Sequence, residues 1–132
     1  MNIDALIPDL WQRYPFLDDK SLRVRLGGIG EEDVAKWASE GSGDRGEVYN
    51  ALARHLAVAF HRGALPFAFC DAVMNDLETV ILNADDERPD FFWQVYLAFD
   101  GGEYARSDKP DEDPVEAYTR PQIASIVEQL PA

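Results

Sequence analysis

Apolar residues recur at helical spacing throughout residues 47–82, which is the most regularly patterned stretch of the chain. The pattern is interrupted once, where Gly63 suits the residue that follows a helix and Pro66 suits the first turn of the next one. The apolar faces on both sides of this corner are wide and require cover from other segments. The pattern therefore predicts a helical hairpin at the centre of the fold. The side chains that we expect to be buried in it are Leu52, Leu56, Phe60, Phe69, Val73, Leu77 and Ile81.

Residues 2–14 predict a helix in front of this hairpin, with Asn2 or Asp4 as its N-terminal cap. Pro8 complicates the prediction, because a proline in a helix interior costs about 3 kcal/mol. A helix that begins near Ile7 would instead place Pro8 in its first turn. The sequence leaves both starting points open.

Residues 31–40 predict a short helix, since acidic side chains in its first turn interact favourably with the helix dipole, and Asp44 follows as a cap for the hairpin. Before it, residues 22–26 alternate apolar and basic positions as a short strand does. With no partner strand in the sequence, we expect an extended linker there. The Gly-Gly-Ile-Gly sequence of residues 27–30 lacks the Lys-Ser/Thr of a phosphate-binding loop.

Residues 91–99 allow two interpretations. Their apolar members lie at i, i+1, i+4, i+5 and i+8, namely Phe91, Phe92, Val95, Tyr96 and Phe99. Aromatic and β-branched side chains favour strands, so a buried strand is the alternative. The period is nearer to 3.6 than to 2, and we therefore expect a helix that is capped by Asp90 and ended by Gly101 and Gly102.

Two cap signals precede the end of the chain. Asp113 followed by Pro114 is the first, and Thr119 with Gln122 as its capping-box partner is the second. An amphipathic helix over residues 123–130 then closes the chain. All these segments together predict an all-α fold, in which residues 1–132 form a single-domain bundle of five to seven helices around the central hairpin.

The composition of the chain bears on the cellular compartment in which we expect the protein. No apolar run approaches the ~20 residues that span a bilayer, and the first ten residues carry acids where a signal peptide carries bases. The single cysteine cannot form an internal disulfide. We therefore expect a cytoplasmic, reduced protein that does not bind membranes.

The charge is unevenly distributed along the chain. Its net value is −13; residues 1–66 carry 10 acids and 8 bases, a balance of −2, whereas residues 67–132 carry 15 acids and 4 bases, a balance of −11. Such a field repels nucleic acids and anionic membranes and attracts basic partners. Solubility alone is the alternative explanation of this acidity.

Candidate reactive residues are few. His55 and His61 lie six residues apart, not four apart as in a helical zinc pair, and His55 lies on the apolar stripe. Cys70 lies near a helix start, where the dipole lowers a thiol pKa, but its apolar neighbours predict an inert, packed thiol. The acidic loops lack the ligand spacing and the glycine of a calcium loop. We therefore expect no catalytic residue, no metal site and no cofactor.

In overall character the chain resembles the small acidic single-domain immunity proteins that bacteria pair with secreted toxins. The resemblance rests on size, charge, the lack of catalytic motifs, and aromatic residues beside acids in residues 67–76, 86–100 and 101–104. It implies an acidic protein-binding module that neutralises a basic toxin by covering it, and it assigns a role to no individual residue.

Two other functions remain open, a carboxylate- or metal-dependent hydrolase and a structural or oligomerising helical module. For the acidic protein-binding module, we place the partner-binding surface on the helix at 91–99 and on the acidic loops at its two ends. The acids would steer the encounter and an aromatic side chain would anchor it. The residues of this predicted surface are Asp85, Asp86, Glu87, Asp90, Trp93, Tyr96, Asp108, Asp111, Glu112 and Asp113.

Overall fold

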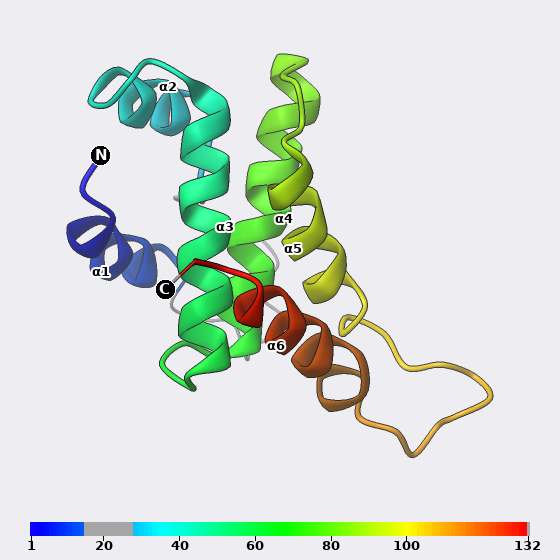
Figure 1. Ribbon diagram of the computed structural model, residues 1–132. Helices are drawn as coiled ribbons and strands as arrows, with labels where there is room; N and C mark the ends of the chain where they lie inside the picture. The colour runs from blue at the N-terminus through cyan, green and yellow to red at the C-terminus, as the bar shows by residue number, and fades with distance from the viewer. Residues whose placement is uncertain (15–27, 132) are drawn as a thin grey trace.

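The computed structural model describes residues 1–14 and 28–131, so the linker expected at residues 22–26 lies outside the described residues. The described part is all-α and contains six α-helices and one π-helical segment. Helix α3 (Arg45–His61) lies in the middle and contacts α1, α2, α4, α5 and α6, which surround it (Figure 1). The predicted helical bundle around a central helix pair is therefore confirmed.

Helices α3 and α4 (Phe67–Ala84) form the predicted hairpin. Asp44 caps α3, since its Oδ1 accepts a hydrogen bond from the Gly46 amide at 2.8 Å. Gly63 has a φ of +77° in the corner, a conformation that glycine adopts without strain, and Pro66 is the cap of α4, one position earlier than expected. All seven side chains predicted to be buried, Leu52, Leu56, Phe60, Phe69, Val73, Leu77 and Ile81, are at most 3% exposed.

Helix α1 (Ile3–Arg13) begins before Pro8, so the first of the two starting points is correct and Pro8 lies inside the helix. The Asn2 side chain accepts hydrogen bonds from the amides of Asp4 and Ala5, which secures the first turn. Leu6 and Leu10 on either side of the proline are buried in the core. Their burial offsets the backbone hydrogen bond that the proline removes.

Helices α2 (Glu31–Ser39) and α5 (Asp90–Asp100) are both present, and α5 settles the choice between helix and strand at residues 91–99. The expectation that Asp90 caps α5 is wrong, because Asp90 is the first helical residue and its side chain makes no capping bond. Asn50 on α3 takes this role from a distance in sequence: its Oδ1 accepts a hydrogen bond from the Phe92 amide at 3.1 Å.

The end of the chain is one continuous helical segment. The π-helical segment η1 (Val115–Thr119) passes directly into α6 (Arg120–Glu128). Asp113 caps its start as predicted, since its Oδ1 accepts a hydrogen bond from the Val115 amide. The capping box at Thr119 is wrong, because Thr119 has helical backbone angles and its hydroxyl donates instead to the Ala98 carbonyl of α5 at 2.7 Å.

Candidate functional site on helix α5

An ion pair between α4 and the start of α5 organises the outer face of this helix pair. Arg88 donates hydrogen bonds to both carboxylate oxygens of Glu78, and Glu78 is only 6% exposed. The fixed guanidinium then lies over the Trp93 ring, 4.2 Å from the ring centroid. Glu78 orients Arg88, and Arg88 stacks on the indole. The position of Trp93 is therefore fixed by its cation–π contact with an ion-paired arginine.

Trp93 and Tyr96 form an ordered aromatic pair on α5. Their ring centroids are 5.1 Å apart and their planes differ by 11°. Both side chains are half-buried, and Leu97 beside them is 44% exposed. The pair therefore presents rigid aromatic surface that is already partly dehydrated, which is the usual character of an anchor residue at a protein interface.

Carboxylates surround the Tyr96 hydroxyl. Burial raises the pKa of Tyr96, and the negative charges of Asp100, Glu103, Glu78 and Asp71 raise it further. Glu78 is neutralised by Arg88, whereas Glu103 receives a single hydrogen bond from the Asn75 amide group at 2.9 Å. The hydroxyl thus lies in a strongly negative region beside an aromatic surface.

Asp100 is the half-buried member of this group. Burial raises the pKa of Asp100 above its usual value, and the nearby charge of Glu103 raises it further. Neither Asp100 nor Glu103 forms an ion pair with a basic side chain among the described residues. We call the surface formed by Trp93, Tyr96, Asp100 and Glu103 the acidic–aromatic face.

The first predicted acidic loop divides into two kinds of residue. Asp85, Glu87 and Asp90 are exposed at the N-terminal end of α5. Asp86 instead accepts hydrogen bonds from Arg45 Nε at 2.8 Å and from the Tyr49 hydroxyl at 2.5 Å. Asp86 therefore ties the end of α4 to α3, and we assign it a structural role.

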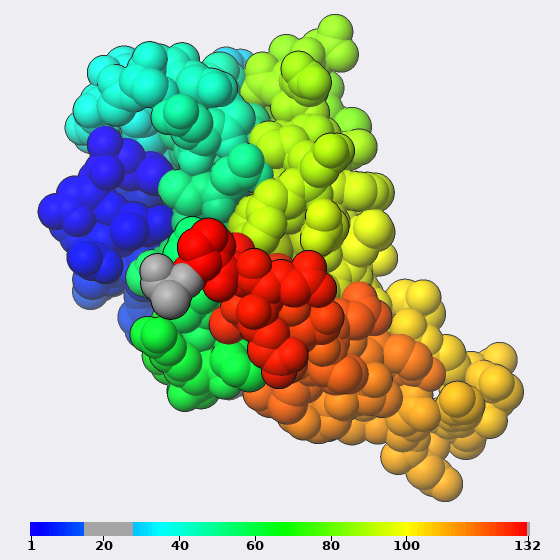
Figure 2. All heavy atoms as spheres, viewed as in Figure 1, coloured from blue at the N-terminus to red at the C-terminus, as the bar shows by residue number. Residues whose placement is uncertain are grey.

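The second predicted acidic loop lies at the other end of α5 and projects away from the helices (Figures 1 and 2). Arg106 holds its base, because the guanidinium lies over the rings of Tyr104 and Tyr118 and donates to the carbonyl of Gly101 at 2.6 Å. Most of its acids are exposed, but Glu112 is half-buried and raises the pKa of the Tyr118 hydroxyl beside it. The exposed carboxylates of this loop are Asp108, Asp111 and Asp113.

Sequence reasoning identified the aromatic pair but missed the carboxylates nearest to it. Asp100 follows Trp93 and Tyr96 at i+7 and i+4, so a helical projection of residues 90–100 places it on the same face. Glu103 reaches this face only because the chain turns after α5 and Asn75 binds it. That contact joins residues that are 28 positions apart and leaves no signal in the sequence.

The other candidate residues keep the structural character expected of them. Cys70 is fully buried, and burial raises the pKa of its thiol far above the usual value. His55 is half-buried on α3 and His61 is exposed at the end of the same helix. Within residues 1–14 and 28–131, no group of three or more His, Cys, Asp and Glu side chains is placed to hold a metal ion.

Comparisons with known proteins add no assignment to these observations. No protein-family model matches the chain, and neither the curated proteins nor the solved structures contain a match to it. In the part of the chain that the structure describes, no helix combines the length and the apolar character that crossing a membrane requires.

Proposed function

We propose that this protein is a binding module that recognises a basic protein through the acidic–aromatic face. One observation carries the proposal: the stacked Trp93–Tyr96 pair lies next to Asp100 and Glu103, where burial raises the pKa of Asp100 and repulsion by Glu103 raises it further. A lysine or arginine from a partner would neutralise these carboxylates. Folding alone leaves that repulsion in place, so a partner gains the energy of relieving it.

The aromatic pair suits the same partner. A guanidinium placed over an indole or phenol ring gains cation–π attraction, and Arg88 already shows this geometry on one side of Trp93. The Tyr96 ring is already stacked against both Phe92 and Trp93. A partner arginine that pairs with Asp100 would therefore approach the edge of this stack. Recognition of this kind joins an aromatic anchor to a desolvated charge pair, which is the combination found at interface hot spots.

The two acidic loops extend this surface in both directions. Helix α5 has 11 residues and is therefore ~16 Å long, so its ends lie within the span of an ordinary interface. Asp85, Glu87 and Asp90 stand at one end, and the loop with Asp108 and Asp111 projects from the other. These exposed charges would accelerate association by long-range attraction, since exposed charges act over about 8–10 Å at moderate ionic strength.

Within this class, neutralisation of a basic toxin is the particular role that the likeness to immunity proteins suggests. The protein would act by covering its target, a task that requires charge and shape but no catalytic residue. The adjacent gene tests this role: a gene for a cationic secreted toxin beside this one supports it, and a gene neighbourhood made up of metabolic enzymes contradicts it.

The direct test is affinity capture from a lysate of the source organism, followed by kinetics with the purified protein that is recovered. The test variant is Asp100→Asn with Glu103→Gln. The matched control is Glu32→Gln with Glu40→Gln, which removes the same charge from exposed positions on α2 and at its end. A third variant, Trp93→Ala, removes the anchor, and the melting temperature of each variant shows that it is folded.

We expect capture of a basic protein whose affinity falls about tenfold or more with Asp100→Asn and Glu103→Gln, and changes much less with the α2 control. Its association rate should decrease as salt increases. Equal losses in the two charge variants would mean that net charge, and not this face, recruits the partner. Capture of no basic protein, or full affinity in Trp93→Ala, would contradict the proposal.

A further inference from the structure

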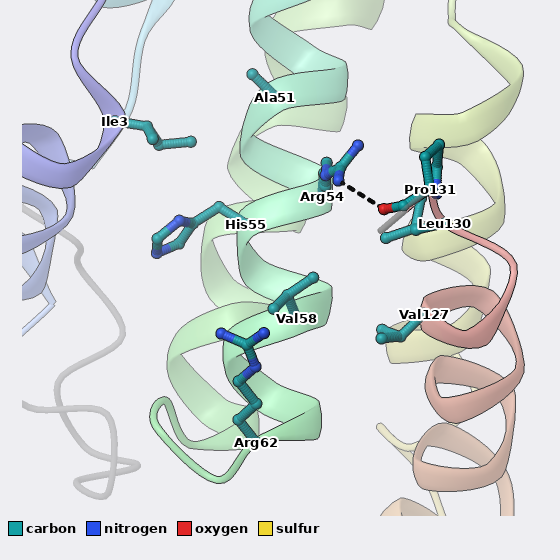
Figure 3. A pocket seen from close by; sticks show the side chains of 9 residues that line it. All are labelled: Ile3, Ala51, Arg54, His55, Val58, Arg62, Val127, Leu130 and Pro131. Carbon is teal, nitrogen blue, oxygen red and sulfur yellow. Dashed lines mark hydrogen bonds between the residues drawn. The ribbon is translucent and has the colours of Figure 1, made fainter.

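A cavity of about 550 Å³ opens between α1, α3 and the end of the chain, away from α4 and α5. Its floor is one stripe of α3, and Ile3 of α1 faces Leu130 and Pro131 across that stripe (Figure 3). The volume falls within the ~300–1,000 Å³ typical of small-molecule sites. The α3 stripe contributes His55 and Arg62, which lie seven residues apart and therefore on one side of the helix.

The basic side chains that line this cavity make it positive, whereas the chain as a whole is negative. Of the arginines that the structure describes, Arg13, Arg45, Arg88 and Arg120 pair with carboxylates. Arg106 is enclosed by two tyrosine rings and bonded to two backbone carbonyls.

The two arginines that remain both line the cavity. Arg62 has no ion pair within the described residues, and Arg54 makes only a long hydrogen bond of 3.5 Å to the Pro131 carbonyl. His55 is half-buried and points to the α1 side of α3, opposite Arg54 (Figure 3), and its side chain makes no hydrogen bond within the described residues. Both arginines are exposed, so their guanidinium groups are hydrated at the rim of the cavity, and neither is paired with a carboxylate from the part of the chain that the structure describes.

We propose that this cavity binds an amphipathic organic anion, an apolar chain that ends in a carboxylate or a phosphate. The guanidinium groups of Arg54 and Arg62 offer planar, paired donors that match either head group. Ile3, Val127 and Leu130 supply apolar walls for the chain of the ligand. The two features act together, because the apolar walls would hold the chain of the ligand while the guanidinium groups at the rim bind its head group.

The test is isothermal titration calorimetry of the full chain with octanoate and octyl phosphate, which carry the two head groups on apolar chains of nearly equal length. Octanol supplies the chain without charge, and acetate supplies the charge without the chain. Arg54→Gln and Arg62→Gln remove one positive charge each at the cavity. Lys36→Gln is the matched control, because it removes one positive charge from an exposed position on α2.

We expect at least one of the two anions to bind saturably, and about tenfold or more tightly than octanol or acetate, which corresponds to ~1.4 kcal/mol. Each arginine variant should lower the affinity for that anion by a similar factor, whereas Lys36→Gln should leave the affinity unchanged. The preferred head group distinguishes carboxylate from phosphate ligands. Absence of saturable binding for both anions, equal affinity for octanol, or unchanged affinity in both arginine variants would overturn the proposal.

Discussion

The close approach of Gly102 to Thr119 determines how much stability the substitution Gly102→Ala should cost. Gly102 is buried where the chain leaves α5, and its φ lies outside the left-handed region that favours glycine. A methyl group at this position would overlap the Thr119 hydroxyl oxygen and would come within 3.1 Å and 3.3 Å of two carbons of the Phe67 ring. The substitution Gly102→Ala is therefore a purely steric perturbation at the base of the projecting loop.

Two contributions add up in this variant. Forcing an extra methyl group into a packed site costs about 1–3 kcal/mol. Displacing Thr119 also weakens its 2.7 Å hydrogen bond to the Ala98 carbonyl, for about 1 kcal/mol more. We expect a loss of about 2–4 kcal/mol in the free energy of unfolding, and a fall of roughly 10 °C in melting temperature for a chain of this size.

Urea unfolding followed by far-UV circular dichroism measures this loss. Gly41→Ala is the matched control, because a methyl group there would lie 3.9 Å from its nearest neighbour and should change stability by less than about 0.5 kcal/mol. Thr119→Ala removes the obstructing hydroxyl, so Gly102→Ala should cost less in that background. A loss below ~0.5 kcal/mol, or an equal loss in both backgrounds, would refute this account of the contact.

Three further outcomes follow from the same structure. Leu56→Ala should cost about 2–5 kcal/mol in urea unfolding, because Leu56 is completely buried on the central helix. Asp100→Asn should raise the melting temperature at pH 7: burial and Glu103 raise the pKa of Asp100, so the ionised form is disfavoured in the folded state. The stability that protonated Asp100 contributes is lost as pH rises through its folded pKa, so the variant's advantage should disappear near pH 3. Removal of metal ions with a chelator should leave the melting temperature unchanged, because no metal ligand set is found within residues 1–14 and 28–131.

Periodicity was sufficient to predict the fold because burial in this protein follows local pattern. The seven side chains predicted to be buried between Leu52 and Ile81 are all members of the core. Helices α2, α3 and α5 end within one or two residues of the expected positions. Local patterns are informative here since each helix buries one continuous stripe against its neighbours.

The capping predictions failed where tertiary contacts replace local ones. Asp90 and Thr119 both match cap signatures, yet Asn50 of α3 caps α5 and the Thr119 hydroxyl binds Ala98. A cap motif considers only hydrogen-bond acceptors that are close in sequence. The amide of Phe92 instead bonds to an acceptor that tertiary packing brings near. Glu103 was missed for the same reason, because it is placed by its contact with Asn75, whereas a helical projection of residues 90–100 already puts Asp100 on this face.

The two proposed surfaces carry opposite charge and lie on different helices, so the variants of one serve as controls for the other. Arg54→Gln and Arg62→Gln leave Asp100 and Glu103 intact and make the chain more negative. Association with a basic partner should then be unchanged or faster at low salt. Conversely, Asp100→Asn with Glu103→Gln reduces the long-range repulsion of anions, so octanoate or octyl phosphate should bind as tightly as before or more tightly. Loss of both kinds of binding in either set of variants would mean that neutralisation disturbs a shared structure, and the two sites could not be regarded as separate.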